Sequence, residues 1–211
     1  MTFPKAASGL RLVFWAKIIE LIGALAVIVL PVINIVSIIG SEDIENASLD
    51  LSLVGILAGV VLPLVGFVLA LIGLIKAGKD HQSFKSAWGI TVGLIIGEAA
   101  LLILNLLNVM STSSINDDFI TLFSGISVIF TLEGIRALYC EKGVATGLVS
   151  TTTVIYVIAV VLEFVLSIWQ SVLVENETLG LILSLILILC TIISYILYLI
   201  CLAKAPKKLM K

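Results

Sequence analysis

The stretch Leu179-Gly-Leu-Ile-Leu-Ser-Leu-Ile-Leu-Ile-Leu-Cys-Thr-Ile-Ile-Ser-Tyr-Ile-Leu-Tyr-Leu-Ile-Cys-Leu202 is followed at once by Ala-Lys-Ala-Pro-Lys-Lys-Leu-Met-Lys211. The first part is an apolar run of the length that a helix needs to cross a bilayer, roughly 20 residues. The second part is short and rich in lysine. Short segments rich in Lys and Arg stay on the cytoplasmic side of a membrane. The stretch therefore predicts a transmembrane helix whose C-terminal end is cytoplasmic.

Five earlier runs meet the same length requirement, so we predict a bundle of six transmembrane helices. The predicted spans are residues 12–40, 51–75, 87–109, 119–139, 147–174 and 179–202. The polar segments beside them alternate between basic and acidic, so that all twelve Lys and Arg residues fall on one side. Both termini are then cytoplasmic. The predicted fold class is an all-α polytopic membrane protein with a single transmembrane domain over residues 1–211.

Composition supports this class and excludes others. The chain is 61% hydrophobic and 12% charged, far from the values of soluble domains. Its basic residues are spread over four short segments, which argues against a nucleic-acid partner. They suit an anionic inner leaflet, which attracts each basic residue by about 1 kcal/mol. Sequons at Asn46 and Asn176 lie in acidic loops, and whether they are ever glycosylated stays open.

One glutamate falls inside each of three predicted spans, at Glu20, Glu98 and Glu163. A charge at the bilayer centre costs at least ~2.5 kcal/mol, so such residues usually face the interior of a helix bundle. No Lys or Arg lies deep enough in the predicted spans to pair with Glu98 or Glu163. We therefore expect these two carboxyl groups to be protonated, hydrogen-bonded or neutralised by a cation.

Neutral polar residues recur beside two of these glutamates at helical spacing. Thr91 and Asn105 lie seven residues on either side of Glu98. Tyr156 and Gln170 lie seven residues on either side of Glu163, so each set shares one helix face. These residues are candidate ligands for an ion or a small solute. The competing interpretation is that they only hydrogen-bond across helices, which is worth about 0.6 kcal/mol on average in membranes. For Glu20, with Lys17 one turn away, we favour the structural interpretation.

Glycines at four-residue spacing occur on two predicted spans. They are Gly89, Gly93 and Gly97 on the third span, and Gly55 and Gly59 on the second. Small residues at this spacing let membrane helices approach closely. The pattern predicts helix packing at these positions.

Signatures of enzymes and of bound metals are missing from the sequence. It contains no HExxH, GxSxG or P-loop motif. The single histidine, His81, lies in a predicted cytoplasmic loop. We therefore expect no catalytic residue, no metal and no cofactor.

Two segments carry a resemblance to known sequences: Ala7-Ser-Gly-Leu-Arg-Leu-Val-Phe-Trp-Ala-Lys-Ile-Ile-Glu20 and Gly73-Leu-Ile-Lys-Ala-Gly-Lys-Asp-His-Gln-Ser-Phe-Lys-Ser-Ala87. They resemble a group of uncharacterised multi-span membrane proteins of Gram-positive gut bacteria. The resemblance covers about a sixth of the chain and implies a bacterial cytoplasmic membrane. It implies no activity. In the second segment, Phe84 and Lys85 are expected to contact the membrane interface.

The sequence leads to two functional hypotheses. In the first, the protein binds or translocates a small solute, proton or cation through its membrane-embedded glutamates. In the second, it is a non-transporting accessory, assembly or immunity-type protein that acts through protein or lipid contacts. A second copy of the chain or another membrane protein remains open as a partner. The substrate, the coupling ion and the direction of transport are not readable from the chain.

Overall fold

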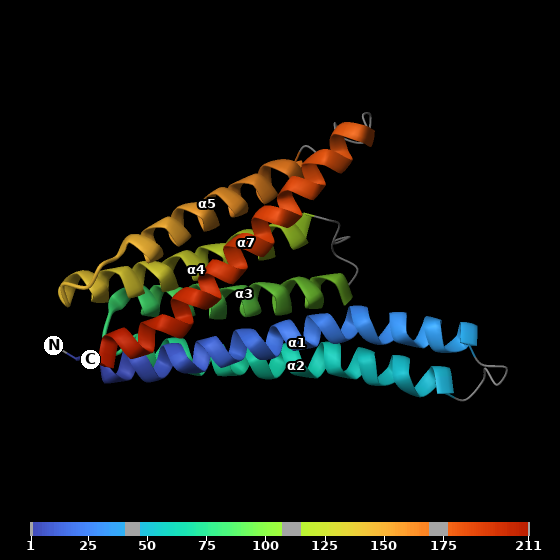
Figure 1. The fold of residues 1–211 in the computed structure, drawn as a ribbon, viewed down its shortest axis with the longest axis horizontal. Helices are drawn as coiled ribbons and strands as arrows, with labels where there is room; N and C mark the ends of the chain where they lie inside the picture. Colours follow the sequence, from blue (N-terminus) through green and yellow to red (C-terminus); the bar gives the residue numbers. More distant parts are fainter. Residues whose placement is uncertain (1, 41–46, 107–114, 169–176, 211) are drawn as a thin grey trace. The chain divides into compact units, whose positions relative to one another are not determined.

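The computed structural model describes residues 2–40, 47–106, 115–168 and 177–210, and these residues form helices joined by short turns (Figure 1). No strand occurs in this part of the chain, so the all-α prediction is confirmed. The helices are α1 (Pro4–Gly40), α2 (Ala47–Ala77), α3 (Gln82–Leu106), α4 (Ile115–Glu141), α5 (Gly147–Ile168) and α7 (Glu177–Met210).

The helices extend beyond the predicted spans mainly at their basic ends. α1 begins at Pro4 rather than at the first apolar residue of its span. Proline suits the first turn of a helix, because its fixed φ is helical and the missing N–H would have no partner there. α7 continues past Leu202 to Met210. The final residues of the fifth predicted span lie after Ile168, outside the described part of the chain.

Among the described residues, five helical segments are long and apolar enough to cross a membrane. They are Pro4–Leu30, Leu57–Ala77, Thr121–Glu141, Gly147–Leu166 and Thr178–Met210. The fold is therefore that of a helical protein suited to a bilayer.

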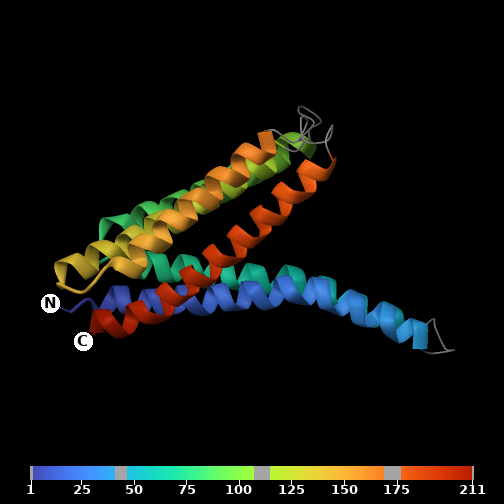
Figure 2. The same cartoon turned by 45° about the horizontal axis from the view of Figure 1, so that its top comes forward.

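The helices divide into two compact units, each of which can be described by itself. The smaller unit is Arg11–Gly73, which holds most of α1 and α2. The larger unit combines Met1–Leu10 with Leu74–Lys211. In the larger unit α4 is central, because it contacts α3, α5 and α7, and α5 also contacts α7 (Figures 1 and 2). The single domain expected over residues 1–211 stays a prediction.

The protein core of the larger unit lies toward one end of its helices. Fully covered side chains come from α4 and from the last turns of α7, together with Phe84 at the start of α3: Leu132, Ile135, Leu138, Leu202, Ala205 and Leu209. Apolar side chains far from this end are open. Leu181 on α7 is 73% exposed and Ile96 on α3 is 66% exposed. Such uncovered apolar side chains suit contact with lipid tails, which solvate them as well as protein does.

Hydrogen bonds join both ends of the chain at the well-covered end. The backbone N–H of Phe3 donates to the carbonyl of Leu209 over 3.3 Å. The Lys142 ammonium donates to the carbonyls of Lys208 and Leu209, at 3.0 and 2.9 Å. The backbone N–H of Ala6 donates to the Asp80 carboxylate over 2.7 Å. We call this part of the larger unit the basic end. The N- and C-terminal segments therefore lie on the same side of the larger unit (Figure 1).

The charges of Asp80 and Lys142 also suit the helix dipoles. Asp80 places a carboxylate at the N-terminus of α1, where the helix carries partial positive charge. Lys142 places an ammonium at the C-terminus of α7, where the last carbonyls lack partners within the helix. Two short turns, after α2 and after α4, thus position charged side chains on the ends of other helices.

Gly143 ends α4 in a left-handed conformation with φ of 67°. The N–H of Gly143 donates to the carbonyl of Cys140 and the N–H of Val144 to that of Tyr139, at 3.0 and 2.9 Å. This is the Schellman pattern, which satisfies the last carbonyls of a helix and favours glycine at the left-handed position. The turn directs the chain from α4 into α5 and fixes the adjacent Lys142.

Replacing this glycine tests the turn. Gly143→Ala should lower the free energy of unfolding by roughly 1–2 kcal/mol, because an L-residue is strained in the left-handed region. Gly147→Ala, at the start of α5, is the matched control, since a methyl group there would meet no neighbour within 4 Å. Thermal unfolding of the detergent-purified proteins measures both. Equal stability of the two variants would contradict this role for Gly143.

Candidate functional site

The three candidate glutamates lie on three different helices, Glu20 on α1, Glu98 on α3 and Glu163 on α5. The side chains of Glu98 and Asn105 are outside the part that the structure describes, and so is residue Gln170. The geometry of Glu20 and Glu163 is described, together with that of Thr91 and Tyr156. These four residues decide what the structure says about the site.

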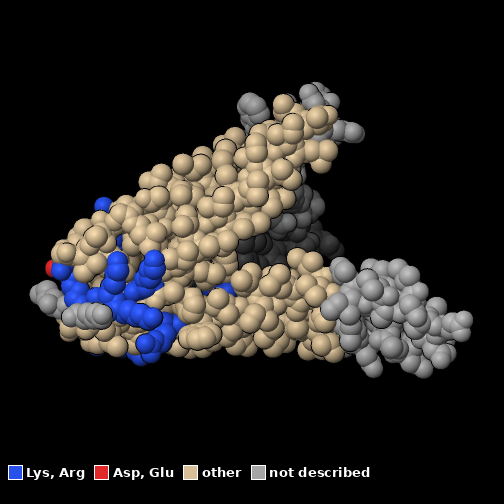
Figure 3. Space-filling view, viewed as in Figure 1, with Lys and Arg blue, Asp and Glu red and all other residues tan. Residues whose placement is uncertain are grey.

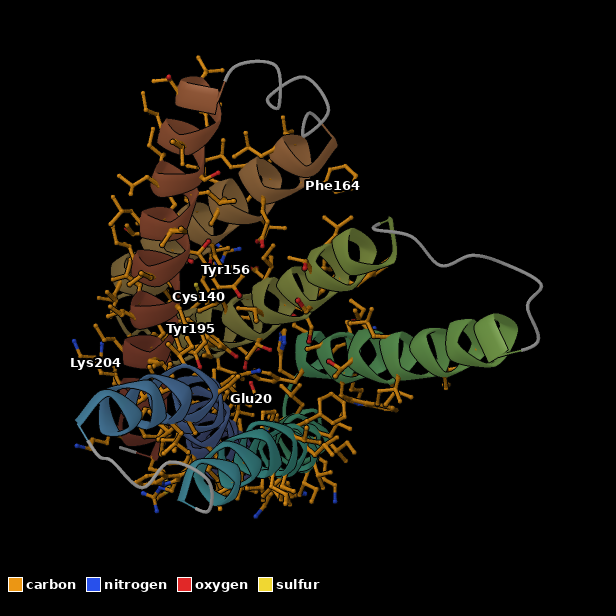
Figure 4. All side chains as sticks on the ribbon, turned by 90° about the vertical axis from the view of Figure 1, so that its right-hand side faces the viewer. Glu20, Cys140, Tyr156, Phe164, Tyr195 and Lys204 are labelled. Carbon is orange, nitrogen blue, oxygen red and sulfur yellow. The ribbon has the colours of Figure 1, made fainter. Side chains whose placement is uncertain are left out.

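Glu20 lies where α1 meets α2 in the smaller unit (Figure 4). Its carboxylate forms an ion pair with Lys17 at 2.6 Å, and the two side chains are 23% and 24% exposed. A methyl group on Gly66 of α2 would lie 2.7 Å from both Glu20 Cγ and the carbonyl oxygen of Ala16. The Glu20 side chain therefore packs directly against Gly66 of α2, and Lys17 balances its charge.

The α1–α2 contact follows a regular pattern of small residues. Gly23 faces the ring of Pro63, whose Cδ atom would lie 2.7 Å from an added methyl group. Gly55 faces Leu30 and Gly59 faces Val27. The contacting positions on α1 are spaced by three and four residues, as in a coiled-coil seam: Ala16, Glu20, Gly23, Val27 and Leu30. Gly55 and Gly59 thus lie at a close helix contact.

The glycine run on α3 has different surroundings. A methyl group on Gly89, Gly93 or Gly97 would meet no atom within 4 Å. All three positions are exposed. We expected these three glycines to pack against a neighbouring helix because of their spacing. They do not lie at a contact between described residues.

Thr91 takes part in a contact between α3 and α4. Its hydroxyl lies 2.8 Å from the hydroxyl of Ser127 on α4. Both hydroxyls also lie within hydrogen-bond distance of the carbonyl of Ala87, at 2.9 and 3.0 Å. Ser127 is buried. The hydroxyl of Thr91 is therefore engaged in joining two helices, one heptad away from Glu98 along α3.

Phe84 anchors the same pair of helices near the basic end. Its side chain is fully buried, and a methyl group on Gly134 of α4 would lie 2.7 Å from its Cζ atom. The expected contact of Phe84 with the membrane interface is therefore not found: the ring is covered by protein. His81, whose ring lies edge-on to Phe84, accepts a hydrogen bond from the N–H of Ser83 at 3.2 Å. This bond caps the start of α3.

Polar side chains also follow the contact between α5 and α7. The Cys201 thiol lies 3.3 Å from the Thr152 hydroxyl, and both side chains are buried. Four residues further along α5, the Tyr156 ring meets the ring of Tyr198 edge-to-face, with centroids 6.1 Å apart. Ser194, one turn before Tyr198, is buried and donates to the carbonyl of Thr191. We call this line of residues the α5–α7 polar seam.

Glu163 lies on the same line of α5, seven residues beyond Tyr156. Its side chain is half-buried. It is not isolated, because Glu163, Tyr156 and Tyr195 each interact with another group. Two predicted site residues, Tyr156 and Glu163, thus share one face of α5, and Tyr156 on that face contacts α7. The structure places Glu20 and Thr91 at two other helix contacts.

The α5–α7 polar seam offers one ionisable carboxyl group among hydroxyl and phenol groups. Oxygen ligands of this kind suit a proton or a hard cation. Among the described residues no group of three or more His, Cys, Asp and Glu could hold a metal ion. A cation bound at Glu163 would therefore need neutral oxygen atoms for most of its coordination shell.

Several residues of these contacts were not selected from the sequence. They are Ser127, Thr152, Ser194 and Cys201. Thr152 precedes Tyr156 by four residues, and Ser194 and Cys201 flank Tyr198 at the same helical spacing. That spacing predicts that these residues share a helix face with Tyr156 or Tyr198. It does not predict which helix the face contacts.

Comparisons with protein-family models, with curated proteins and with solved structures found no match for this chain.

Substituting alanine for glycine at two positions tests which glycines lie at a close helix contact. Gly66→Ala should destabilise the protein by about 1–3 kcal/mol, because the added methyl group overlaps the α1 backbone and Glu20. Gly89→Ala should leave stability unchanged or slightly raise it, since its surroundings are open and alanine favours helix. Thermal unfolding in one detergent compares both with wild type. A larger loss for Gly89→Ala would show that the α3 glycines are the closer contact.

Proposed function

We propose that the chain is an integral membrane protein of six spans, with both termini in the cytoplasm, that binds or translocates a small solute, proton or cation. Glu163 is its ionisable group and Tyr156 a neighbouring ligand. Glu98, with Asn105, is a second carboxyl group of the same kind on α3. The protein resides in a bacterial cytoplasmic membrane and acts without a catalytic residue or a cofactor.

The half-buried Glu163 in the α5–α7 polar seam is the observation that carries this proposal. A carboxyl group inside an apolar span is costly and is seldom retained without a role. Glu163 has hydroxyl-bearing residues along the same helix pair, and the segment Gly147–Leu166 around it contains no lysine or arginine. Gain or loss of a proton, or exchange of a proton for a cation, would therefore change the net charge of this seam.

The topology is supported by the hydrogen bond between Phe3 and Leu209, which holds both chain ends on one side of the larger unit. Two ends on one side require an even number of crossings. Five segments qualify as spans by length and composition, and α3 supplies the sixth. With 25 residues it is about 37 Å long, enough for a hydrocarbon core of about 30 Å. The lysine-rich segments support cytoplasmic placement of that side.

A specific observation favours the second candidate function, a non-transporting accessory protein. The carboxylate of Glu20 is neutralised by Lys17, and the hydroxyl of Thr91 is shared with Ser127. Two of the residues selected as site candidates thus stabilise helix contacts. If Glu163 does the same, the protein acts through contacts with lipids or other proteins.

Substituting the carboxyl group by an amide separates the two functions. Wild-type protein in detergent, at mildly alkaline pH, should unfold at a higher temperature when a bound cation is present. At a cation concentration of about 100 times Kd the stabilisation is about 2.7 kcal/mol. Glu163→Gln should lose this response, because the amide keeps the shape and removes the charge. A panel of monovalent and divalent cations identifies the ion.

Glu133→Gln is the matched control for this experiment. Glu133 pairs with Arg136 at 2.6 Å on an exposed face of α4, so its loss removes one carboxylate without touching the α5–α7 polar seam. It should keep the cation response of wild type. If no cation shifts the unfolding temperature of wild type, the ion-binding proposal fails and the accessory function remains. A response of wild type that Glu163→Gln retains would assign the ion to another carboxylate.

A further inference from the structure

The last turns of α7 are amphipathic. At 3.6 residues per turn, Tyr198, Leu202, Ala205 and Leu209 share one face, and all four are buried. Lys204 and Lys207 lie on the opposite face and are exposed. The tail of α7 is thus a packed helix that presents lysines on its outer side, and Figure 3 shows basic side chains crowded at this end.

Four described lysines of the larger unit gather around the joined chain ends: Lys5, Lys204, Lys207 and Lys208. We call them the terminal lysine patch. Lys208 is partly covered and lies over the Tyr139 ring, with its Nζ atom 5.2 Å from the ring centroid. This cation–π contact fixes the Lys208 side chain against Tyr139 and keeps its ammonium group at the surface of α4.

Two of the nearby acidic groups are already engaged. The Asp80 carboxylate accepts the N–H of Ala6, and the Glu133 carboxylate binds Arg136 through two hydrogen bonds, at 2.8 and 2.6 Å. Glu141 is exposed at the end of α4. The positive charge of the patch therefore exceeds the negative charge of the acidic groups at the basic end.

The patch is also held in place. Lys142 donates to the carbonyls of Lys208 and Leu209, and Phe3 donates to Leu209. Lys204 and Lys207 project from a helix that is fixed at its end, so a ligand that binds them does not have to order a loose tail. A smaller loss of conformational entropy strengthens binding. Their place at the end of an apolar span suits a ligand at the membrane surface rather than one in bulk water.

We propose that the terminal lysine patch binds the phosphate groups of anionic phospholipids of the adjoining leaflet. The ligand chemistry is a phosphodiester, which lysine recognises as a point charge. Lys204 and Lys207 make the principal contacts, and Lys5 and Lys208 flank them. This site does not depend on Glu163 and goes beyond the proposed ion or solute binding.

Titration of the full chain with defined lipids tests the site. Detergent-purified protein is mixed with phosphatidylglycerol or with phosphatidylcholine of the same acyl chains, and native mass spectrometry counts bound lipid. Wild type should bind phosphatidylglycerol more tightly. The double variant K204Q/K207Q should weaken that binding roughly 10- to 30-fold, since each basic residue near the surface contributes about fivefold. Binding of phosphatidylcholine should not change.

The double variant K79Q/K85Q is the matched control, because both lysines are exposed in or just after the α2–α3 turn and the same charge is removed. It should retain most of the preference for phosphatidylglycerol. Equal losses in the two double variants would overturn the proposal in favour of general charge attraction. Absence of any preference in wild type would also overturn it. Inorganic phosphate is added as a competitor: displacement of the lipid by phosphate alone would assign the patch to a soluble anion and overturn the lipid assignment.

Discussion

The absence of water inside a bilayer is the constraint on which the other features of this protein depend. A polar group without a partner costs several kcal/mol in hydrocarbon. Among the described residues that are not exposed, every buried side-chain nitrogen or oxygen has a hydrogen-bond partner. Some partners lie in the same helix, as Lys17 does for Glu20, and others join two helices, as in Thr91 with Ser127 and Cys201 with Thr152. Polar residues in the spans thus locate the helix contacts, whether or not they also bind a ligand.

The same constraint explains why the protein core of the larger unit lies at the basic end. Toward the middle of a bilayer, lipid tails would cover Leu and Ile as well as protein does, so there would be little gain in burying Leu189 or Ile96. Near the water interface, apolar side chains gain from burial and free carbonyls need partners. Phe84, Leu138 and Leu209 are fully covered there, and Lys142 and Asp80 serve the ends of α7 and α1.

The apolar helices were predictable because length and apolarity are local properties, whereas the partners of each helix were not. Pro4 and Lys204–Lys208 are not apolar, so hydropathy did not include them, and the helices continue there because hydrogen bonds from other segments satisfy their ends. The glycine pattern on α3 showed that close approach is possible without naming a neighbour. Gly66, which stands outside the Gly55–Gly59 motif, faces Glu20 instead. In the site, the 3–4 spacing placed Tyr156 and Glu163 on one face, but only the structure pairs that face with α7.

The bond between Phe3 and Leu209 has a consequence for the order in which the chain is made. The ribosome synthesises α1 before α7, so Phe3, just before α1, has its partner only after α7 has been made. Ala6 finds Asp80 earlier, after α2 has been synthesised. The basic end is therefore assembled in two stages, the first once Asp80 has been synthesised and the second once Leu209 has been synthesised. A ribosome that stops before α7 leaves a chain in which Ala6 can still bind Asp80 but Phe3 has no Leu209 to bind.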